Sequence, residues 1–262
     1  MHQYLFFIGN FPIRLYGIFF SLGIISGCIT AYFLLKKDRR GWESHMFDLG
    51  LVIAFAGIVG GRLWDVFFFD WEYYHNHLLE IPYIWQGGMA IQGGIIFACI
   101  AAYFYLKKHQ IPVLPFADTV TPGIILGQAI GRIANFMNGD AFGHPTGQDF
   151  GLLYPDTTLA YHTYGAQPLW PAEVWECQGD LLIFVLLLWY GCKTRAEGTT
   201  FCLYIMFYSL LRFFLENYRG DYGTLALGLK SAQITSLAAF AGAFILFLYF
   251  HFKYKSKSGI SE

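Results

Sequence analysis

The chain has 262 residues, of which 56% are apolar and only 13% are charged, whereas charged residues make up about 25% of a typical soluble domain. This composition indicates an integral membrane protein and excludes an ordinary soluble domain. The net charge of −1 argues against a nucleic-acid partner, and the five cysteines show no CxxC spacing, so neither a metal centre nor a disulfide framework is expected.

Seven stretches are long and apolar enough to form transmembrane helices, which need about 20 residues each. In chain order they cover approximately residues 14–35, 46–68, 89–107, 115–137, 173–191, 199–217 and 231–252. Glycines four residues apart at 23/27, 57/61 and 123/127/131 predict close packing between helices. We therefore expect an all-α, polytopic membrane protein with a single membrane domain over residues 1–252.

The lysines and arginines predict the orientation of this domain. Eleven of the 17 lie in the segments 36–40, 107–108, 193–195 and 253–257, which share one side of the membrane if seven helices alternate. Because basic loops face the cytoplasm, the N-terminus is expected outside and residues 253–262 form a cytoplasmic tail. The segment near 139–171, rich in Gly, Pro, Thr and Tyr, is expected to be an outer cap that guides an acceptor peptide.

The remaining basic residues map to the outer side, and all but one are arginines. They are Arg14, Arg62, Arg132, Arg212, Arg219 and Lys230. Ionisable groups at membrane depth are costly and commonly functional, and the planar arginine fork matches a phosphate. Pairing with neighbouring acids is the structural alternative, but for Arg62, Arg132 and Arg212 together we favour a shared anionic lipid.

Two polar patterns accompany these arginines. The first, Gly131-Arg-Ile-Ala-Asn-Phe-Met-Asn-Gly-Asp-Ala-Phe-Gly143, ends the fourth apolar stretch. The second consists of Tyr208, Arg212, Glu216 and Arg219, which form a single stripe on a helix. Arg212 and Glu216 could simply neutralise one another, although the stripe contains more polar groups than one ion pair needs.

These patterns resemble the phosphatidylglycerol–prolipoprotein diacylglyceryl transferases of bacterial inner membranes. The signature of that family is Gly-Arg-x-(Gly/Ala)-Asn-Phe-x-Asn-x-Glu-x-x-Gly. Seven fixed positions match and Asp140 replaces the glutamate; the matches are Gly131, Arg132, Ala134, Asn135, Phe136, Asn138 and Gly143. The segments 14–17, 60–63 and 231–236 also resemble family segments, so the resemblance covers most of the chain.

The resemblance implies a multi-pass enzyme of the bacterial cytoplasmic membrane that needs no cofactor or metal. Such enzymes transfer the diacylglyceryl group of phosphatidylglycerol to the lipobox cysteine of a prolipoprotein signal peptide, form a thioether and release glycerol phosphate. It makes Arg132 and Arg212 catalytic, because they would stabilise the charge that develops on the leaving phosphate. Implied substrate-binding residues are Tyr16, Arg62, Asn135, Asn138, Asp140, Gly143, Tyr208, Glu216 and Arg219.

Two positions depart from the family pattern. Gln92, the third expected catalytic residue, stands where the family has a histidine, and an amide cannot accept a proton at neutral pH. The family segment His-Pro-x-Gln-x-x-Glu becomes Trp170-Pro-Ala-Glu173-Val-Trp-Glu176. In one alternative, Gln92 positions substrate while the arginines favour a thiolate. In another, the base is Glu173 or Asp140. The remaining alternative is a divergent paralogue with another acceptor, or a phospholipid-binding protein without transfer.

Other interpretations of single features are weaker. A transporter would show a repeat that relates two halves of the chain, and none is visible. Ile25-Ser-Gly-Cys28 looks like a lipobox, which would make the chain a substrate, but the basic cluster after it fits a cytoplasmic loop. His144 is a possible base beside the signature, and His75 with His77 would need a third ligand to hold a metal.

Overall fold

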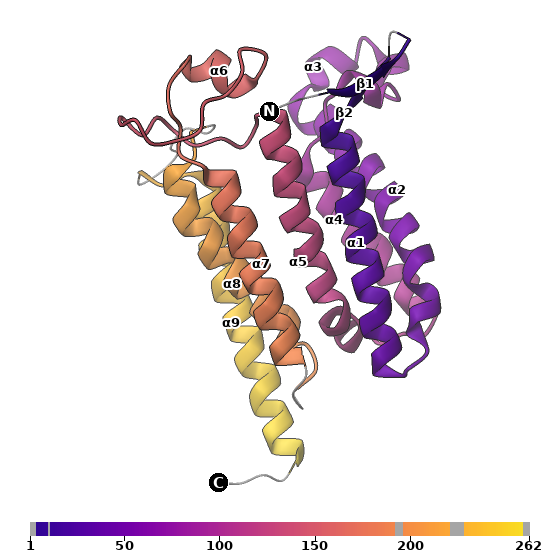
Figure 1. The fold of residues 1–262 in the computed structure, drawn as a ribbon. Coiled ribbons are helices and arrows are strands. Elements are labelled where there is room, and N and C mark those ends of the chain that lie inside the picture. Colours follow the sequence, from indigo (N-terminus) through magenta and orange to yellow (C-terminus); the bar gives the residue numbers. More distant parts are fainter. Residues whose placement is uncertain (1–3, 10, 192–195, 221–227, 259–262) are drawn as a thin grey trace. The chain divides into compact units, whose positions relative to one another are not determined.

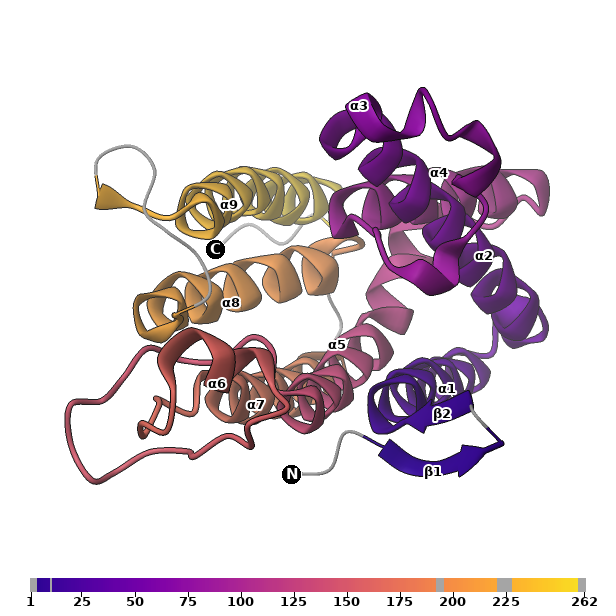
Figure 2. The ribbon, with the colours of Figure 1, turned by 90° about the horizontal axis from the view of Figure 1, so that it is seen from above.

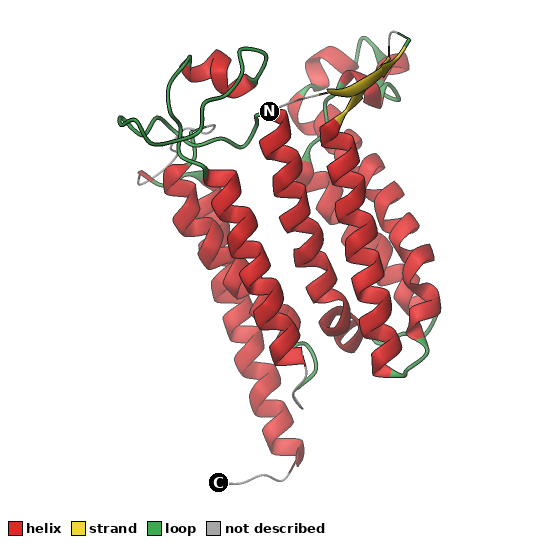
Figure 3. Cartoon of the chain, viewed as in Figure 1, coloured by secondary structure: helices red, strands yellow, loops and turns green. Residues whose placement is uncertain are grey.

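A computed structural model describes residues 4–9, 11–191, 196–220 and 228–258, which divide into two compact units. One unit comprises residues 1–34 and 117–262, and the other comprises residues 35–116. Helices dominate both units (Figures 1 and 3). Five helical stretches are long and apolar enough to cross a membrane, namely Leu15–Asp38, Trp42–Phe69, Val113–Asn138, Thr199–Tyr218 and Ser231–Ser256. The chain is therefore a polytopic membrane protein, as its composition predicts.

Two further elements that the sequence analysis counts as spans are helical but are not among these five. They are α4 (Ile91–Lys108) and α7 (Ala172–Gly191). One element was not expected at all: an antiparallel hairpin of β1 (Tyr4–Ile8) and β2 (Phe11–Arg14) precedes the first helix. Gly9 has a φ of +60° in the turn between the strands, a conformation that glycine adopts without steric cost.

In the larger unit, α1 (Leu15–Asp38) packs against α5 (Val113–Asn138) through glycines. A Cβ atom added to Gly27 would lie 2.7 Å from the carbonyl oxygen of Gly123, and one added to Gly23 would lie 2.8 Å from that of Gly127. The predicted small-residue packing of these two helices is thus confirmed. Gly131 is an exception, because a Cβ atom there would meet nothing within 4 Å.

The rest of the larger unit is built from α7, α8 (Thr199–Leu215) with the 3-10 turn η5 (Glu216–Tyr218), and α9 (Ser231–Ser258). Figure 2 shows α8 between α7 and α9. Ile125, Ile183 and Leu187 form a buried core that joins α5 to α7. α9 remains helical through Ser258, so the first residues of the expected tail belong to a helix.

The outer segment 139–171 lies between α5 and α7 and contains α6 (Leu159–Tyr164). It has a small apolar core of its own, made by Phe142, Tyr154, Ala160 and Leu169. Its backbone is hydrogen-bonded to the chain just after α8: His144 donates to the Tyr218 carbonyl over 2.9 Å, and Phe142 accepts from Gly220 over 3.0 Å. The segment is therefore a packed layer over the ends of α7 and α8 (Figure 1).

In the smaller unit, α2 (Met46–Trp64) and α4 pack along their lengths in opposite directions. Gly60 meets Gly93 near the end of α2, and His45, just before α2, is hydrogen-bonded to Tyr105 near the end of α4. The helices are preceded and connected by short elements: η1 (Trp42–His45), the π turn η2 (Asp65–Phe69), α3 (Trp71–Tyr74), η3 (Leu78–Glu80) and η4 (Ile84–Gln86).

Candidate functional site

Three arginines of the larger unit meet at a single carboxylate. Two of them lie on the helices α5 and α8, and the third follows the turn after α8. Glu176, in the second turn of α7, forms an ion pair with Arg132 of α5 over 2.7 Å. It lies 3.3 Å from Arg212 of α8 and 3.6 Å from Arg219, which follows η5. The sequence analysis expected Arg132 and Arg212 to converge, and the structure brings them to the same group.

The stripe on α8 completes this arrangement. Arg212 also forms an ion pair with Glu216 over 2.8 Å, one helical turn further along, which is the pairing named as the structural alternative. The Tyr208 hydroxyl accepts from Arg132 over 3.2 Å and donates to Glu176 over 3.4 Å. All four residues of the stripe therefore belong to one connected polar network.

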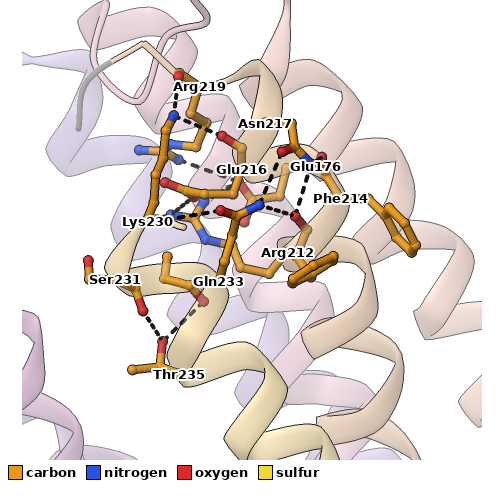
Figure 4. Close-up of polar contacts among 12 residues, drawn as sticks. Glu176, Arg212, Phe214, Glu216, Asn217, Arg219, Lys230, Ser231, Gln233 and Thr235 are labelled. Carbon is orange, nitrogen blue, oxygen red and sulfur yellow. Dashed lines mark hydrogen bonds and ion pairs between the residues drawn. The ribbon is translucent and has the colours of Figure 1, made fainter. Parts of the chain in front are cut away.

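Residues at the beginning of α9 form hydrogen bonds with the end of α8 and the turn η5 (Figure 4). The Lys230 ammonium group donates to the backbone carbonyls of Glu216, over 2.9 Å, and Arg219. Gln233 donates to the carbonyl of Phe213 and the side chain of Asn217. These bonds satisfy carbonyl groups at the end of a helix, and they place a positive charge where the helix dipole favours it.

The signature residues form a second, adjoining network. Asp140 accepts from Asn135 over 2.6 Å and from Asn138 over 2.7 Å, and Asn135 in turn lies 3.4 Å from an Arg132 nitrogen. Tyr16, in the first turn of α1, is close enough to interact electrostatically with Asp140 and Arg132. Asp140 replaces the family glutamate and still has both carboxylate oxygens engaged.

Gly143 has a structural explanation. Its backbone pairs with Arg219 in an isolated β-bridge, and a Cβ atom at this position would clash with the backbone of Trp170. Any other residue would force residues 143 and 170 apart within the outer segment and so disturb the bridge to Arg219. Gly143 therefore acts on the arginine cluster through the backbone.

Three buried acids lie on α7; the sequence offered Glu173 as a candidate base but left Glu176 and Asp180 without roles. Glu173, Glu176 and Asp180 are 0% exposed and recur at helical spacing on one face. Glu173 accepts a hydrogen bond from the Tyr154 hydroxyl of the outer segment, and both oxygens of Asp180 lack a hydrogen-bond partner among the described residues. The spacing of three acids in an apolar helix was the available signal for this face.

Arg62 and Gln92 belong to the smaller unit, whereas the other expected site residues belong to the larger one. Arg62 is 3% exposed and donates four hydrogen bonds to backbone carbonyls of its own unit. Gln92 is exposed in the first turn of α4. These two residues are therefore described separately from Arg132 and Arg212, within their own unit.

The weaker candidates gain no support from geometry. The His144 ring donates to the neighbouring Pro145 carbonyl over 2.9 Å, and Cys28 lies in the middle of α1. Within the described residues, no group of three or more histidine, cysteine or acidic side chains could hold a metal ion, so His75 and His77 have no third ligand there.

Part of the arginine surface of this cluster remains accessible. Glu176 is 1% exposed, whereas the side chains of Arg132 and Arg212 keep 20% and 14% of their surface accessible. The shared carboxylate therefore orients the guanidinium groups from their buried side, and their accessible surface could contact an anion. Fixed guanidinium groups of this kind can bind a phosphate and stabilise charge that develops on it.

Comparisons with known proteins point in the same direction. The family model described as "Prolipoprotein diacylglyceryl transferase" matches residues 3–249. Proteins named phosphatidylglycerol–prolipoprotein diacylglyceryl transferase are similar to most of the chain. The one from Clostridium botulinum strain Langeland is 35% identical over 238 residues, 90% of this chain and 92% of the relative. The one from Staphylococcus saprophyticus is 35% identical over 88% of this chain and 82% of its own length, and that from Halalkalibacterium halodurans is 33% identical over 92% and 84%.

Proposed function

The chain belongs to the prolipoprotein diacylglyceryl transferase family, and we propose that it transfers the diacylglyceryl group of phosphatidylglycerol to the lipobox cysteine of prolipoproteins. The convergence of Arg132, Arg212 and Arg219 on Glu176 is the observation that carries this proposal. It provides an anion site in a protein with several membrane helices, which suits a lipid phosphate.

The chemistry makes a specific demand on such a site. The cysteine sulfur attacks a glycerol carbon, a C–S bond forms, and the C–O bond to the phosphate breaks with its electron pair remaining on the phosphate oxygen. Glycerol phosphate therefore leaves with more negative charge than the lipid phosphate carried. Arg132 and Arg212 stabilise that charge, which is the condition for a faster displacement.

The other polar residues are assigned supporting roles. Asn135, Asn138 and Asp140 hold the loop beside Arg132, and Tyr208 and Glu216 fix the two guanidinium groups. The thiol proton must go to a group other than Gln92, because an amide does not accept it at neutral pH. Asp140 and Glu173 are the carboxylates of this region that remain candidates for the base.

We place the protein in the bacterial cytoplasmic membrane with seven spans, an outer N-terminus and a cytoplasmic C-terminus. The site then faces outward, where prolipoproteins arrive, and the outer segment 139–171 guides the acceptor peptide. No cofactor is required by this reaction. Phosphatidylglycerol, the prolipoprotein signal peptide and the surrounding membrane lipids are the partners.

The test is complementation of a bacterial strain that lacks its own diacylglyceryl transferase. Wild type, Arg132→Ala, Arg212→Ala and Gln92→His are compared, with thioether formation on a prolipoprotein as the direct readout. Rescue by wild type and by neither alanine variant is the expected result.

Two outcomes would contradict the proposal. Rescue by both alanine variants would show that the arginine cluster is dispensable. Rescue by Gln92→His alone, with no activity from wild type, would indicate a divergent paralogue that binds phospholipid but does not transfer it to this acceptor.

A further inference from the structure

Arg62 holds together the segment of short helical turns and loops that follows η2 in the smaller unit. Its guanidinium group donates to the carbonyl of Ile81 over 2.7 Å and to that of Glu80 over 3.1 Å. On the other side of the segment it donates to Gly87 over 2.7 Å and to Gly88 over 3.0 Å. One side chain therefore donates to four backbone carbonyl groups, of which that of Glu80 also accepts from the Tyr83 N–H over 2.9 Å.

The same segment exposes large apolar side chains. Leu79 is 86% exposed and Trp85 is 73% exposed. The chain from Trp71 to Met89 exposes further large apolar residues, including Trp71, Tyr73, Leu78, Ile84 and Met89. An apolar surface of this size is unusual for a loop in water.

The position of the segment identifies what covers this surface. It follows directly on the candidate span Trp42–Phe69, whose last residues Phe67, Phe68 and Phe69 are also exposed. Tryptophan and tyrosine gather where the hydrocarbon meets the headgroups. Polar residues of the segment, such as Glu72 and His75, also remain exposed, which suits an interface and excludes the hydrocarbon core.

We infer that residues 71–89 lie within the membrane interface with Leu79 and Trp85 immersed in lipid, and that Arg62 serves this segment as a clamp on its backbone. Backbone carbonyl groups that are shielded from water need protein donors, and these four face a guanidinium group that is itself buried. Arg62 supplies these donors, which explains why this buried arginine forms no ion pair among the described residues and interacts with the nearby Asp65 only at longer range. It holds the loop in place and does not grip a phosphate.

Fluorescence quenching of Trp85 tests the location. Wild type and Trp85→Phe are reconstituted in vesicles of phosphatidylglycerol and phosphatidylcholine, and the difference between them isolates Trp85 from the other six of the seven tryptophans. Some vesicles carry bromine near the headgroup end of the acyl chain, others near its methyl end. Trp170→Phe is the control, since that ring is half-buried and packs against Phe150, Trp175 and Tyr218.

The expected result is that bromine near the headgroups quenches the Trp85 component more strongly than deep bromine does, while aqueous iodide leaves it unquenched. Quenching by iodide without quenching by bromine would place the loop in water and overturn the inference. Protection from both quenchers would overturn it as well, because a protein surface would then cover Trp85.

The role of Arg62 is tested by Arg62→Lys. Lysine keeps the charge, but all of its N–H donors are on one nitrogen and it lacks the planar fork of arginine. It therefore cannot reach carbonyls on both sides of the segment. The Trp85 component should then lose its bromine quenching and become accessible to iodide. Glu80→Gln, which leaves every backbone carbonyl in place, is the matched control, and unchanged quenching in Arg62→Lys would refute the clamp.

Discussion

At the scale of single residues, Glu176 determines how three guanidinium groups are oriented. Glu176→Gln keeps the shape but removes the charge that Arg132, Arg212 and Arg219 share. Removing one partner of a buried ion pair costs about 3–5 kcal/mol, and the partial exposure of two of the arginines places this variant towards the lower value. We expect a lower unfolding temperature in detergent and a loss of transferase activity.

The control for this variant is Asp149→Asn, which removes an exposed acid from the outer segment. It should leave the unfolding temperature unchanged. If Glu176→Gln transfers diacylglyceryl groups at the wild-type rate, the shared carboxylate does not position the arginines.

Variants at the contact between Tyr154 and Glu173 distinguish two roles of Glu173, that of a positioning acid and that of the catalytic base. Glu173→Gln retains an oxygen that accepts from the Tyr154 hydroxyl, so a structural role predicts nearly full stability and activity. Tyr154→Phe leaves the buried Glu173 without its donor, which costs about 1–3 kcal/mol. Unfolding measurements and initial rates on both variants decide the question: loss of turnover in Glu173→Gln at unchanged stability would make Glu173 the base.

Tyr154 also gives this contact a pH dependence. Burial, together with the neighbouring Glu173, raises the pKa of Tyr154 above its ordinary value of 10.0. The folded state therefore binds this proton more tightly than the unfolded state, and the stability from the contact is complete below pH 10 and is lost as the pH rises above it. The stability difference between wild type and Tyr154→Phe should shrink above that pH in alkaline unfolding curves.

At this scale the convergence of Arg132 and Arg212 could be expected from the sequence, but the acid that joins them could not. Arg132 and Arg212 were predicted to meet because both are arginines in the outer parts of apolar stretches. Arg62 looked the same in the sequence, yet its partners are backbone carbonyls, which carry no sequence signal. Glu176 was missed because a carboxylate that three arginines share is recognised only when three separate elements are packed together.

At the scale of elements, glycine contacts fix how α1 packs against α5. In Gly27→Ala the new Cβ atom would lie 2.7 Å from the Gly123 carbonyl oxygen, so the helices must separate. Gly17→Ala on the same helix meets open space, and alanine favours helix by up to about 1 kcal/mol. Thermal unfolding should show a loss for Gly27→Ala and none for Gly17→Ala; equal unfolding temperatures would contradict close packing.

The predicted elements differ from the observed ones where local signals conflict. All seven expected stretches are helical, because long apolar runs favour helices strongly. The hairpin Tyr4–Arg14 was overlooked, although Gly9 followed by asparagine between two apolar runs is a turn signal. Apolar strands of four or five residues beside a membrane span are easily taken for the start of that span.

At the scale of the whole molecule, helix directions within each unit bear on the number of spans. Arg132 near the end of α5 and Arg212 near the end of α8 both contact Glu176 at the start of α7. α5 and α8 therefore run in the same direction, and α7 must return the chain between them. If α5 and α8 cross the membrane, so does α7. In the smaller unit, α4 runs antiparallel along α2 in the same way, which supports seven spans.

Topology reporters test this count at internal positions, because five and seven spans share the same parity and the C-terminus alone does not distinguish them. Alkaline phosphatase, which is active outside, is fused after residues 88, 108, 170 and 195, and a fluorescent protein that requires the cytoplasm is fused at the same sites. Seven spans predict phosphatase activity after 88 and 170 and fluorescence after 108 and 195. If α4 did not cross, phosphatase activity after 88 would persist after 108, and the end of α5 that carries Arg132 would face the cytoplasm. That result would separate the arginine cluster from incoming prolipoproteins, whereas alternation at all four sites would place it on their side.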